Sequence, residues 1–146
     1  MVLHFAIEGG DFTAAGEASS RVKAVLRQLG LEAGFIRRVA IATYEAEMNV
    51  VIHAYHGEME VGIGPEAVEV RVVDEGPGIP DIELATQEGY STAPEAVREM
   101  GFGAGMGLSN MKRCSDELAI ESRVGAGTSV YMRFALDGGR GRESGG

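Results

Sequence analysis

The stretch GFGAGMGLSNMKRC, residues 101–114, places glycine at four alternate positions: Gly101, Gly103, Gly105 and Gly107. Each glycine costs the folded chain up to about 1 kcal/mol of backbone entropy relative to alanine. Such a run is expected where the backbone turns sharply or approaches a ligand closely, and the residues after it predict a helix over 108–114. A glycine-rich loop that leads into a helix N-terminus presents N–H groups to an anion, most often a phosphate. Taken alone, such a run is more often a flexible turn.

The composition of the chain is that of a globular domain. Of its 146 residues, 45% are hydrophobic and 24% charged, and the formal net charge is −9. An acidic chain is not expected to bind nucleic acid or an anionic membrane, although local dipoles and a metal ion can hold a phosphate on it. The single cysteine, Cys114, allows no internal disulfide, and we find neither a signal peptide nor a membrane-spanning run. We therefore expect a cytoplasmic domain over residues 1–136 and a disordered polar tail over residues 137–146.

The hydrophobic pattern alternates between the period of strands and the period of helices. Strands are predicted over 2–10, 59–64, 67–74, 118–122 and 128–136, and helices over 13–30, 35–57 and 108–114. Residues 82–100 carry only a weak helical pattern, and we interpret them as a partly mobile lid. This order predicts a two-layer α/β sandwich, in which helices cover one face of a mixed, mostly antiparallel sheet.

The spacing of the glycine run excludes two common phosphate-binding motifs. Counted from Gly101 or Gly103, the sixth position of G-x-G-x-x-G holds Met106 or Leu108. The G-K-[ST] of a P-loop is missing, as are the H-R-D and D-F-G motifs of eukaryotic-type kinases. The run therefore disfavours a Rossmann domain, a P-loop ATPase and a eukaryotic-type kinase.

Two polar side chains share one face of the long predicted helix. Glu45 and Asn49, within YEAEMN at 44–49, are four residues apart and therefore project one turn from each other. A glutamate can polarise a hydroxyl or a water, and an amide oxygen suits Mg²⁺, which keeps most of its waters. The same spacing is common on solvated helix faces, so it does not decide the function alone.

A carboxylate and several glycines mark the ends of two predicted strands. Asp74 ends one strand and is followed by Gly76 and Gly78. The carboxylate can accept a hydrogen bond from an exocyclic amine such as that of adenine, and the glycines let a flat base approach. Thr128 follows Gly127 at the start of the last strand, where its hydroxyl is placed to support Asp74 or the base through water. Each piece also fits an ordinary turn.

Taken together, these pieces resemble the GHKL ATPase superfamily with its Bergerat nucleotide fold. The resemblance covers residues 1–136 and rests on four motifs. The matching residues are Glu45 and Asn49 in E-x-x-x-N, Asp74, Gly76, Gly78 and Ile79 in D-x-G-x-G-I, Gly103, Gly105, Gly107 and Leu108 in G-x-G-x-G-L, and Gly125, Gly127 and Thr128 in G-x-G-T.

Within that superfamily, the chain resembles the bacterial anti-sigma factor serine-protein kinases and the stressosome switch kinases. EAEMNVVIHAY, which includes His53, is similar to the first branch, and DEGPGIPDIELATQEGYST is similar to the second. The resemblance implies an ATP site with a lid. The implied nucleotide-binding residues are Asn49, His53, Asp74, Gly76, Gly78, Ile79, Gly101, Gly103, Ala104, Gly105, Met106, Gly107, Leu108 and Thr128.

The resemblance also implies an activity. The chain is expected to transfer phosphate from ATP to a serine or threonine of a STAS-domain antagonist protein, with Glu45 as the base and Mg²⁺ held by Asn49. A sigma factor or a regulatory phosphatase is the expected output partner, and homodimer formation stays open. Two other functions also stay open: an anti-sigma factor that acts mainly by ATP-tuned sequestration, and a stand-alone histidine-kinase-like ATPase domain.

Overall fold

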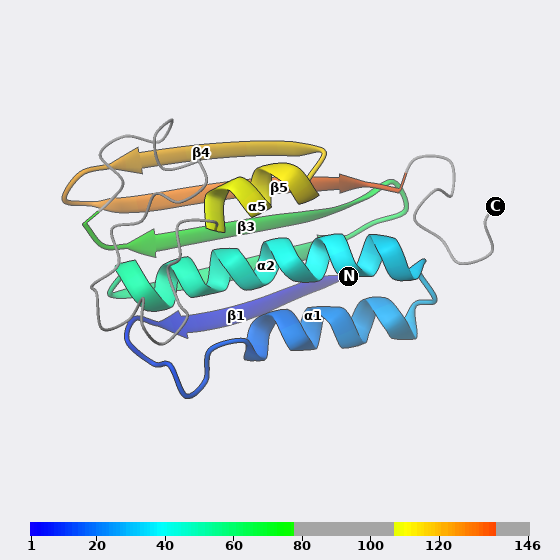
Figure 1. Cartoon of the computed structure of the whole chain (residues 1–146), viewed down its shortest axis with the longest axis horizontal. Coiled ribbons are helices and arrows are strands. Elements are labelled where there is room, and N and C mark those ends of the chain that lie inside the picture. Colours follow the sequence, from blue (N-terminus) through cyan, green and yellow to red (C-terminus); the bar gives the residue numbers. More distant parts are fainter. Residues whose placement is uncertain (78–106, 137–146) are drawn as a thin grey trace.

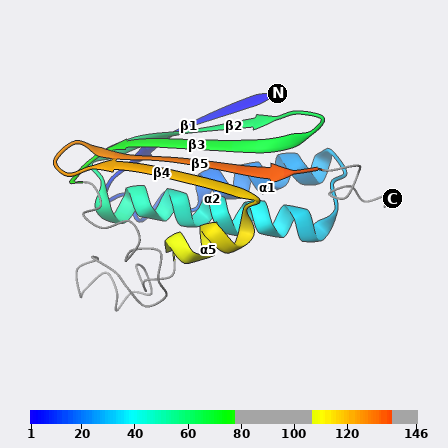
Figure 2. The same cartoon turned by 90° about the horizontal axis from the view of Figure 1, so that it is seen from above.

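The computed structural model describes residues 1–77 and 107–136, which form one sheet and one layer of helices (Figure 1). The elements in chain order are β1 (Val2–Glu8), α1 (Glu17–Gln28), α2 (Ala33–His53), β2 (His56–Ile63), β3 (Ala67–Glu75), α5 (Gly107–Cys114), β4 (Glu117–Arg123) and β5 (Gly127–Ala135). Seen from above, α1, α2 and α5 all lie against the same face of the sheet (Figure 2). The predicted two-layer α/β sandwich is confirmed. The predicted lid over 82–100, the glycine run over 101–106 and the tail lie outside the described residues.

The sheet has five strands in the order β1-β2-β3-β5-β4, and every neighbouring pair is antiparallel. Our expectation of a mixed sheet is wrong in this detail. Two helices lie between β1 and β2, and each successive element reverses the direction of the chain, so β2 returns antiparallel to β1. A parallel pair would instead need a single crossover element between the two strands.

The core lies between the inner face of the sheet and the helices. Val68, Val70 and Val72 on β3 are buried, as the period-2 pattern predicts, whereas Val73 on the outer face is 57% exposed. α2 lies in the middle of the helix layer and packs against α1 on one side and α5 on the other. The buried residues of the three helices include Val22, Leu26, Phe35, Ile36, Val39, Met48, Val51, Leu108 and Met111. This packing fixes α2 over the centre of the sheet.

The C-terminal end of α2 differs from the prediction. We expected the helix to stop at Gly57, but it ends at His53, because Ala54 is extended with φ −106° and ψ 168°. Gly57 lies within β2 opposite Asp74, where an added Cβ would meet the Asp74 Cβ at 3.1 Å. The glycine is therefore explained by a close approach between strands rather than by the end of a helix. Of the helices in residues 1–77 and 107–136, none is long and apolar enough to cross a membrane.

Candidate functional site

A short polar row interrupts the apolar inner face at one end of the sheet. Gly57 on β2 is paired with Asp74 on β3, and Ser122 on β4 is paired with Thr128 on β5. Asp74 and Thr128 are joined directly, because the Thr128 N–H donates to Asp74 Oδ1 at 3.1 Å. Asp74 lies two residues beyond the buried Val72 and therefore on the same face of β3. The row places a carboxylate where the sheet meets the end of α2.

The Asp74 carboxylate is half-buried and held in a defined orientation. Burial raises the pKa of this carboxyl, and the hydrogen bond from the Thr128 N–H opposes that rise. A cavity of about 500 Å³ opens beside it and is lined in part by Ser122, Gly127 and Thr128. One oxygen is fixed by the backbone of β5, so the group is suited to accept a hydrogen bond from a planar amine. This is the position at which the sequence predicts the adenine-reading carboxylate.

Thr128 contacts its neighbours through both its hydroxyl and its backbone. The hydroxyl, which is expected to support Asp74 or the base through water, lies 2.9 Å from the Ser122 hydroxyl across the β4–β5 hairpin. The direct support for Asp74 comes from the backbone N–H of the same residue. That interaction depends on strand register rather than on side-chain type, so a sequence motif does not reveal it.

Two glycines of the motifs are required by close backbone contacts. Gly127 has φ 148°, and a Cβ added to it would lie 2.1 Å from the Asp74 carbonyl oxygen. A Cβ on Gly76 would lie 2.9 Å from the Ala54 Cα, at the end of α2. Real Cβ atoms do not come this close to backbone atoms, so neither position has room for a side chain. The two glycines therefore let the end of β3 pack directly against its neighbours.

The C-terminal end of α2 is anchored to the sheet by backbone hydrogen bonds. The Gly10 N–H donates to the Val51 carbonyl at 2.7 Å, and the Gly9 N–H donates to the Tyr55 carbonyl at 2.8 Å. The Tyr55 N–H in turn donates to the Glu75 carbonyl at 2.8 Å. The ends of β1 and β3 therefore fix the helix turn that carries Asn49 and His53.

Glu45, Asn49 and His53 follow one another at intervals of one helical turn on α2, and all three are partly buried. Burial raises the pKa of the Glu45 carboxyl, and a hydrogen bond with Asn110 of α5 lowers it in part. Burial lowers the pKa of the His53 imidazole. A carboxylate with a raised pKa beside a neutral amide is an arrangement that can accept a proton close to a bound cation.

A buried residue that supports the site, and that our sequence analysis did not single out, lies between Glu45 and Asn49. Glu47 is only 3% exposed, and it accepts hydrogen bonds from three backbone N–H groups at the start of α1. Its Oε2 accepts from Gly16 at 3.0 Å and from Ala18 at 3.2 Å, and its Oε1 accepts from Ser19 at 3.1 Å. The carboxylate of α2 thus caps α1 and fixes the two helices side by side. One sequence signal could have indicated Glu47. It is the third acidic or amide residue of YEAEMN, and it lies on a different face of the helix from Glu45 and Asn49.

The predicted helix after the glycine run is confirmed and begins at Gly107, one residue before the predicted start at Leu108. Leu108, a predicted nucleotide-binding residue, places its side chain in the core together with Met111. Lys112 and Arg113 lie in the last turn of α5, far from its N-terminus, and Arg113 donates to Asn110 Oδ1 at 3.1 Å. The other predicted contacts of this region lie outside the described residues: Gly78, Ile79, Gly101, Gly103, Ala104, Gly105 and Met106.

Comparison with known proteins identifies the class. A family model described as "Histidine kinase-like ATPase domain" matches residues 11–134, so the chain belongs to that family. An anti-sigma F factor of Geobacillus stearothermophilus is 35% identical to this chain over 135 residues, which cover 86% of this chain and 89% of that protein. The serine/threonine-protein kinase RsbT of Bacillus subtilis is 32% identical over 112 residues, which cover 73% and 77% of the two chains. The predicted resemblance to the anti-sigma and switch kinases of the GHKL group is confirmed.

A solved structure supports the fold independently. The mycobacterial sensor histidine kinase MprB superposes with a TM-score of 0.54 over 96% of this chain and 99% of that chain, at 18% identity. At this identity the likeness concerns the fold alone. Membership of the ATPase family implies that the chain uses ATP.

Proposed function

We propose that this chain is an ATP-dependent serine/threonine protein kinase that phosphorylates a STAS-domain antagonist protein in a partner-switching pathway. The observation that carries the proposal is the pair Glu45 and Asn49, which lie one turn apart on α2 with a raised pKa at the glutamate. The names of the relatives, an anti-sigma F factor and a serine/threonine-protein kinase, support this reading.

The nucleotide is proposed to bind between the polar row of the sheet and the end of α2. Asp74 accepts a hydrogen bond from the exocyclic amine of adenine, and its orientation is supported by the bond from Thr128. His53 and Gly76 border the same end of α2. The glycine run over 101–107 and the start of α5 supply N–H groups to the phosphates, in keeping with the preference of helix N-termini for anions. Gly78, Ile79, Ala104 and Met106 belong to the same proposed set, and Leu108 belongs to it through its backbone N–H, since its side chain lies in the core.

Asn49 is the residue that fits Mg²⁺. Its amide oxygen is a hard, neutral ligand, and its side chain is only partly buried. Within the described part of the chain, no three His, Cys, Asp or Glu side chains gather into a metal cluster. An ion held through one amide would take its remaining ligands from water and phosphate oxygens, as Mg²⁺ commonly does. When bound, the ion would neutralise charge on the phosphates.

Glu45 is proposed as the general base. Its carboxylate takes the proton from the incoming serine or threonine hydroxyl, whose oxygen forms the new bond to the γ-phosphorus as the bond to ADP breaks. Glu45 must be ionised to do this, and burial raises its pKa toward the pH at which the proton is transferred. Asn110 keeps the carboxylate oriented from the neighbouring helix α5.

The test is a phosphotransfer assay followed by intact mass. The chain is mixed with Mg-ATP and with the STAS-domain proteins of its own genome, and a single phosphate on one of them is expected. Glu45→Gln should slow the transfer by about 10²–10⁴-fold while leaving ATP affinity unchanged, and Glu58→Gln, an exposed glutamate of β2, is the matched control. If Glu45→Gln transfers phosphate at the normal rate, Glu45 is not the base.

A second function is favoured by the name that several relatives share, anti-sigma F factor. In that function the chain sequesters a sigma factor, and ATP tunes its shape. Capture of a sigma factor by the ATP-loaded chain, without phosphate on any STAS-domain protein, would favour sequestration over phosphorylation.

A further inference from the structure

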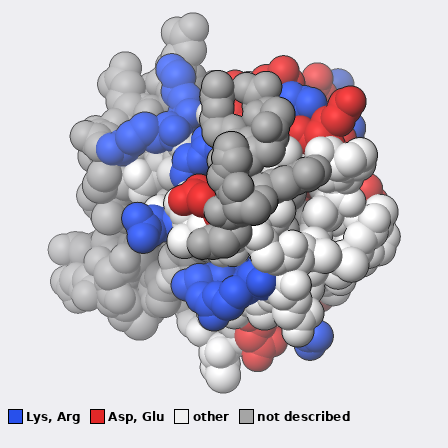
Figure 3. Space-filling model, turned by 90° about the vertical axis from the view of Figure 1, so that its right-hand side faces the viewer, with Lys and Arg blue, Asp and Glu red and all other residues white. Residues whose placement is uncertain are grey.

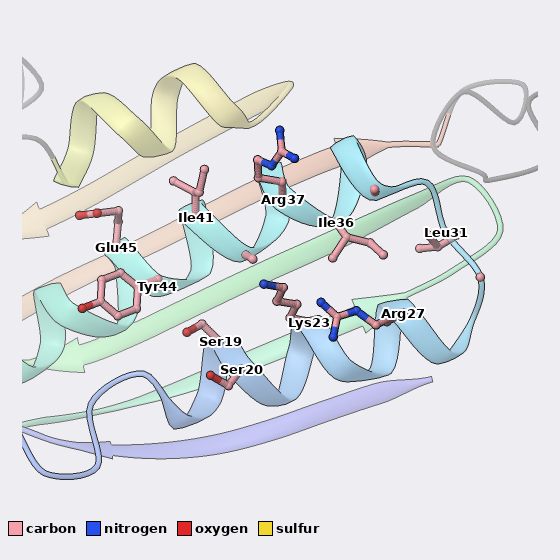
Figure 4. Close-up of a pocket in the computed structure, with 13 residues that line it drawn as sticks. Ser19, Ser20, Lys23, Arg27, Leu31, Ile36, Arg37, Ile41, Tyr44 and Glu45 are labelled. Atoms are coloured by element: carbon pink, nitrogen blue, oxygen red, sulfur yellow. The ribbon is translucent and has the colours of Figure 1, made fainter.

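A groove of about 620 Å³ runs between α1 and α2 on the side of the helix layer away from the sheet (Figure 4). The short connection between the two helices closes one end, and Leu31 and Ile36 lie there. At the other end Tyr44 stands opposite Ser19 and Ser20, and the Glu45 side chain at the same end points toward α5 (Figure 4). The groove therefore leads to the proposed catalytic base from the outside of the molecule.

The walls of this groove are basic, although the chain carries a net charge of −9. Lys23 and Arg27 lie one turn apart on α1, and Arg37 lies on α2. In the described part of the chain, none of these three forms an ion pair within 4 Å. Figure 3, which views the end of the molecule where α1 is joined to α2, shows basic side chains at this end together with acidic ones. The groove thus concentrates positive charge that no ion pair among the described residues holds within 4 Å.

The acidic groups at the groove offset only part of this charge. The Glu32 carboxylate, which caps α2 by accepting the N–H groups of Gly34 at 2.8 Å and Phe35 at 2.9 Å, interacts electrostatically with Arg37 but leaves Lys23 and Arg27 on the opposite wall. Glu45 lies at the far end of the groove. An acidic partner is therefore attracted to the middle and to the closed end of the groove.

The surface between these charges is apolar. Ile41 and Tyr44 are each 38% exposed, and Ile36 and Ala40 form part of the same lining. A groove between two helices, with an apolar floor and a basic rim, is suited to receive an amphipathic helix that bears acidic residues beside its apolar stripe.

The groove and the proposed catalytic residues also share one stripe of α2. Arg37, Ile41 and Glu45 are spaced by four residues, and Asn49 continues the series. A segment bound along Arg37 and Ile41 consequently ends beside Glu45, where a hydroxyl would have to arrive. We propose that this groove docks an acidic, amphipathic helix of the protein substrate and so delivers its serine or threonine to Glu45, an inference that rests on the proposed kinase function.

The first test measures docking without catalysis. The probe is a fluorescein-labelled, helix-forming peptide with glutamates on one face and leucines on the other, followed by fluorescence anisotropy. The double variant Arg27→Gln/Arg37→Gln should weaken its binding by about tenfold or more, and so should a tenfold rise in NaCl. The matched control is Arg71→Gln/Arg133→Gln, which removes the same charge from the outer face of the sheet and should leave the affinity unchanged.

The second test measures docking during phosphotransfer. With the STAS-domain substrate, Arg27→Gln/Arg37→Gln should raise KM by about tenfold, while the rate at saturating substrate stays within about twofold, because neither arginine is proposed to act on the phosphates. ATP affinity should not change. A loss of rate at saturation with an unchanged KM would contradict a docking role.

The outcomes separate this inference from the proposed function. Peptide binding that depends on Arg27 and Arg37, without any phosphotransfer, would support the groove and overturn the kinase assignment. Phosphotransfer whose KM is the same in the groove variant and the control would support the kinase and overturn the groove. Absence of peptide binding, with self-association of the chain that the groove variant abolishes, would show that a second copy occupies the groove and would also overturn the proposal.

Discussion

Replacing Glu47 by alanine is expected to lower the free energy of unfolding by about 3–5 kcal/mol. The carboxylate is 3% exposed and is the acceptor for three backbone N–H groups of Gly16, Ala18 and Ser19, at 3.0–3.2 Å. Alanine would leave these donors at the start of α1 without their acceptor, in a position that water reaches poorly.

The magnitude follows from the number and kind of these bonds. A helix cap of one hydrogen bond contributes about 1 kcal/mol, and a bond to a charged acceptor contributes about 1.5–3 kcal/mol. Counting about 1–1.7 kcal/mol for each of three bonds that share one carboxylate gives about 3–5 kcal/mol. For a chain of this length, that loss corresponds to a fall in Tm of roughly 6–20 °C.

The assay is urea unfolding followed by far-UV circular dichroism, because the chain contains no tryptophan. Glu47→Gln should lie between wild type and Glu47→Ala, since it keeps one acceptor oxygen but loses the charge. Glu58→Ala, an exposed residue of β2, is the control and should change stability by less than about 0.5 kcal/mol. A loss below about 1 kcal/mol for Glu47→Ala would refute the capping role.

Three further predictions concern the site. Gly127→Ala should cost about 3 kcal/mol in the same unfolding assay, because its Cβ would lie 2.1 Å from the Asp74 carbonyl oxygen at φ 148°, and an unchanged midpoint would count against this packing. Asp74→Asn should weaken the binding of a fluorescent ATP analogue by about 10–100-fold, with the circular dichroism unchanged, and unaltered affinity would remove Asp74 from the adenine site. Asn110→Ala removes the hydrogen bond that lowers the pKa of Glu45. Since Glu45 must be ionised, the acid limb of the pH–rate profile should move to higher pH, and a shift to lower pH would contradict the proposed role.

The sequence predicts the layers of this fold because its periodicities are strong. Val68, Val70 and Val72 alternate with exposed residues, and β3 forms where that alternation occurs. The motif positions are also predictable from periodicity. A spacing of four residues places Glu45 and Asn49 on one face of α2, and the alternation of β3 places Asp74 on the inner face of the sheet. The orientation of Asp74 is not predictable, because it depends on the N–H of Thr128, which pairing between distant strands brings close.

Other features depend on contacts that carry no local signal. Glu47 resembles any other glutamate of a helix until α1 is folded against α2, and the end of α2 is set by the pairing of Tyr55 with Glu75 rather than by Gly57. The groove between α1 and α2 likewise brings together Lys23 and Arg37 only after the two helices have packed. These three features depend on tertiary contacts, and the sequence alone therefore did not predict them.

The backbone anchor at the end of α2 makes this helix a lever with its pivot at one end. With a rise of 1.5 Å per residue, Glu45 lies about 9 Å from Val51 and Arg37 about 21 Å from it. For the same small tilt of α2 about the anchor, Arg37 moves more than twice as far as Glu45. A change at the α1–α2 contact that tilts α2 therefore alters the width of the groove at Arg37 more than it displaces the base, which moves less than half as far. The docking residue and the catalytic residue therefore lie on the same helix but at different distances from its anchored end.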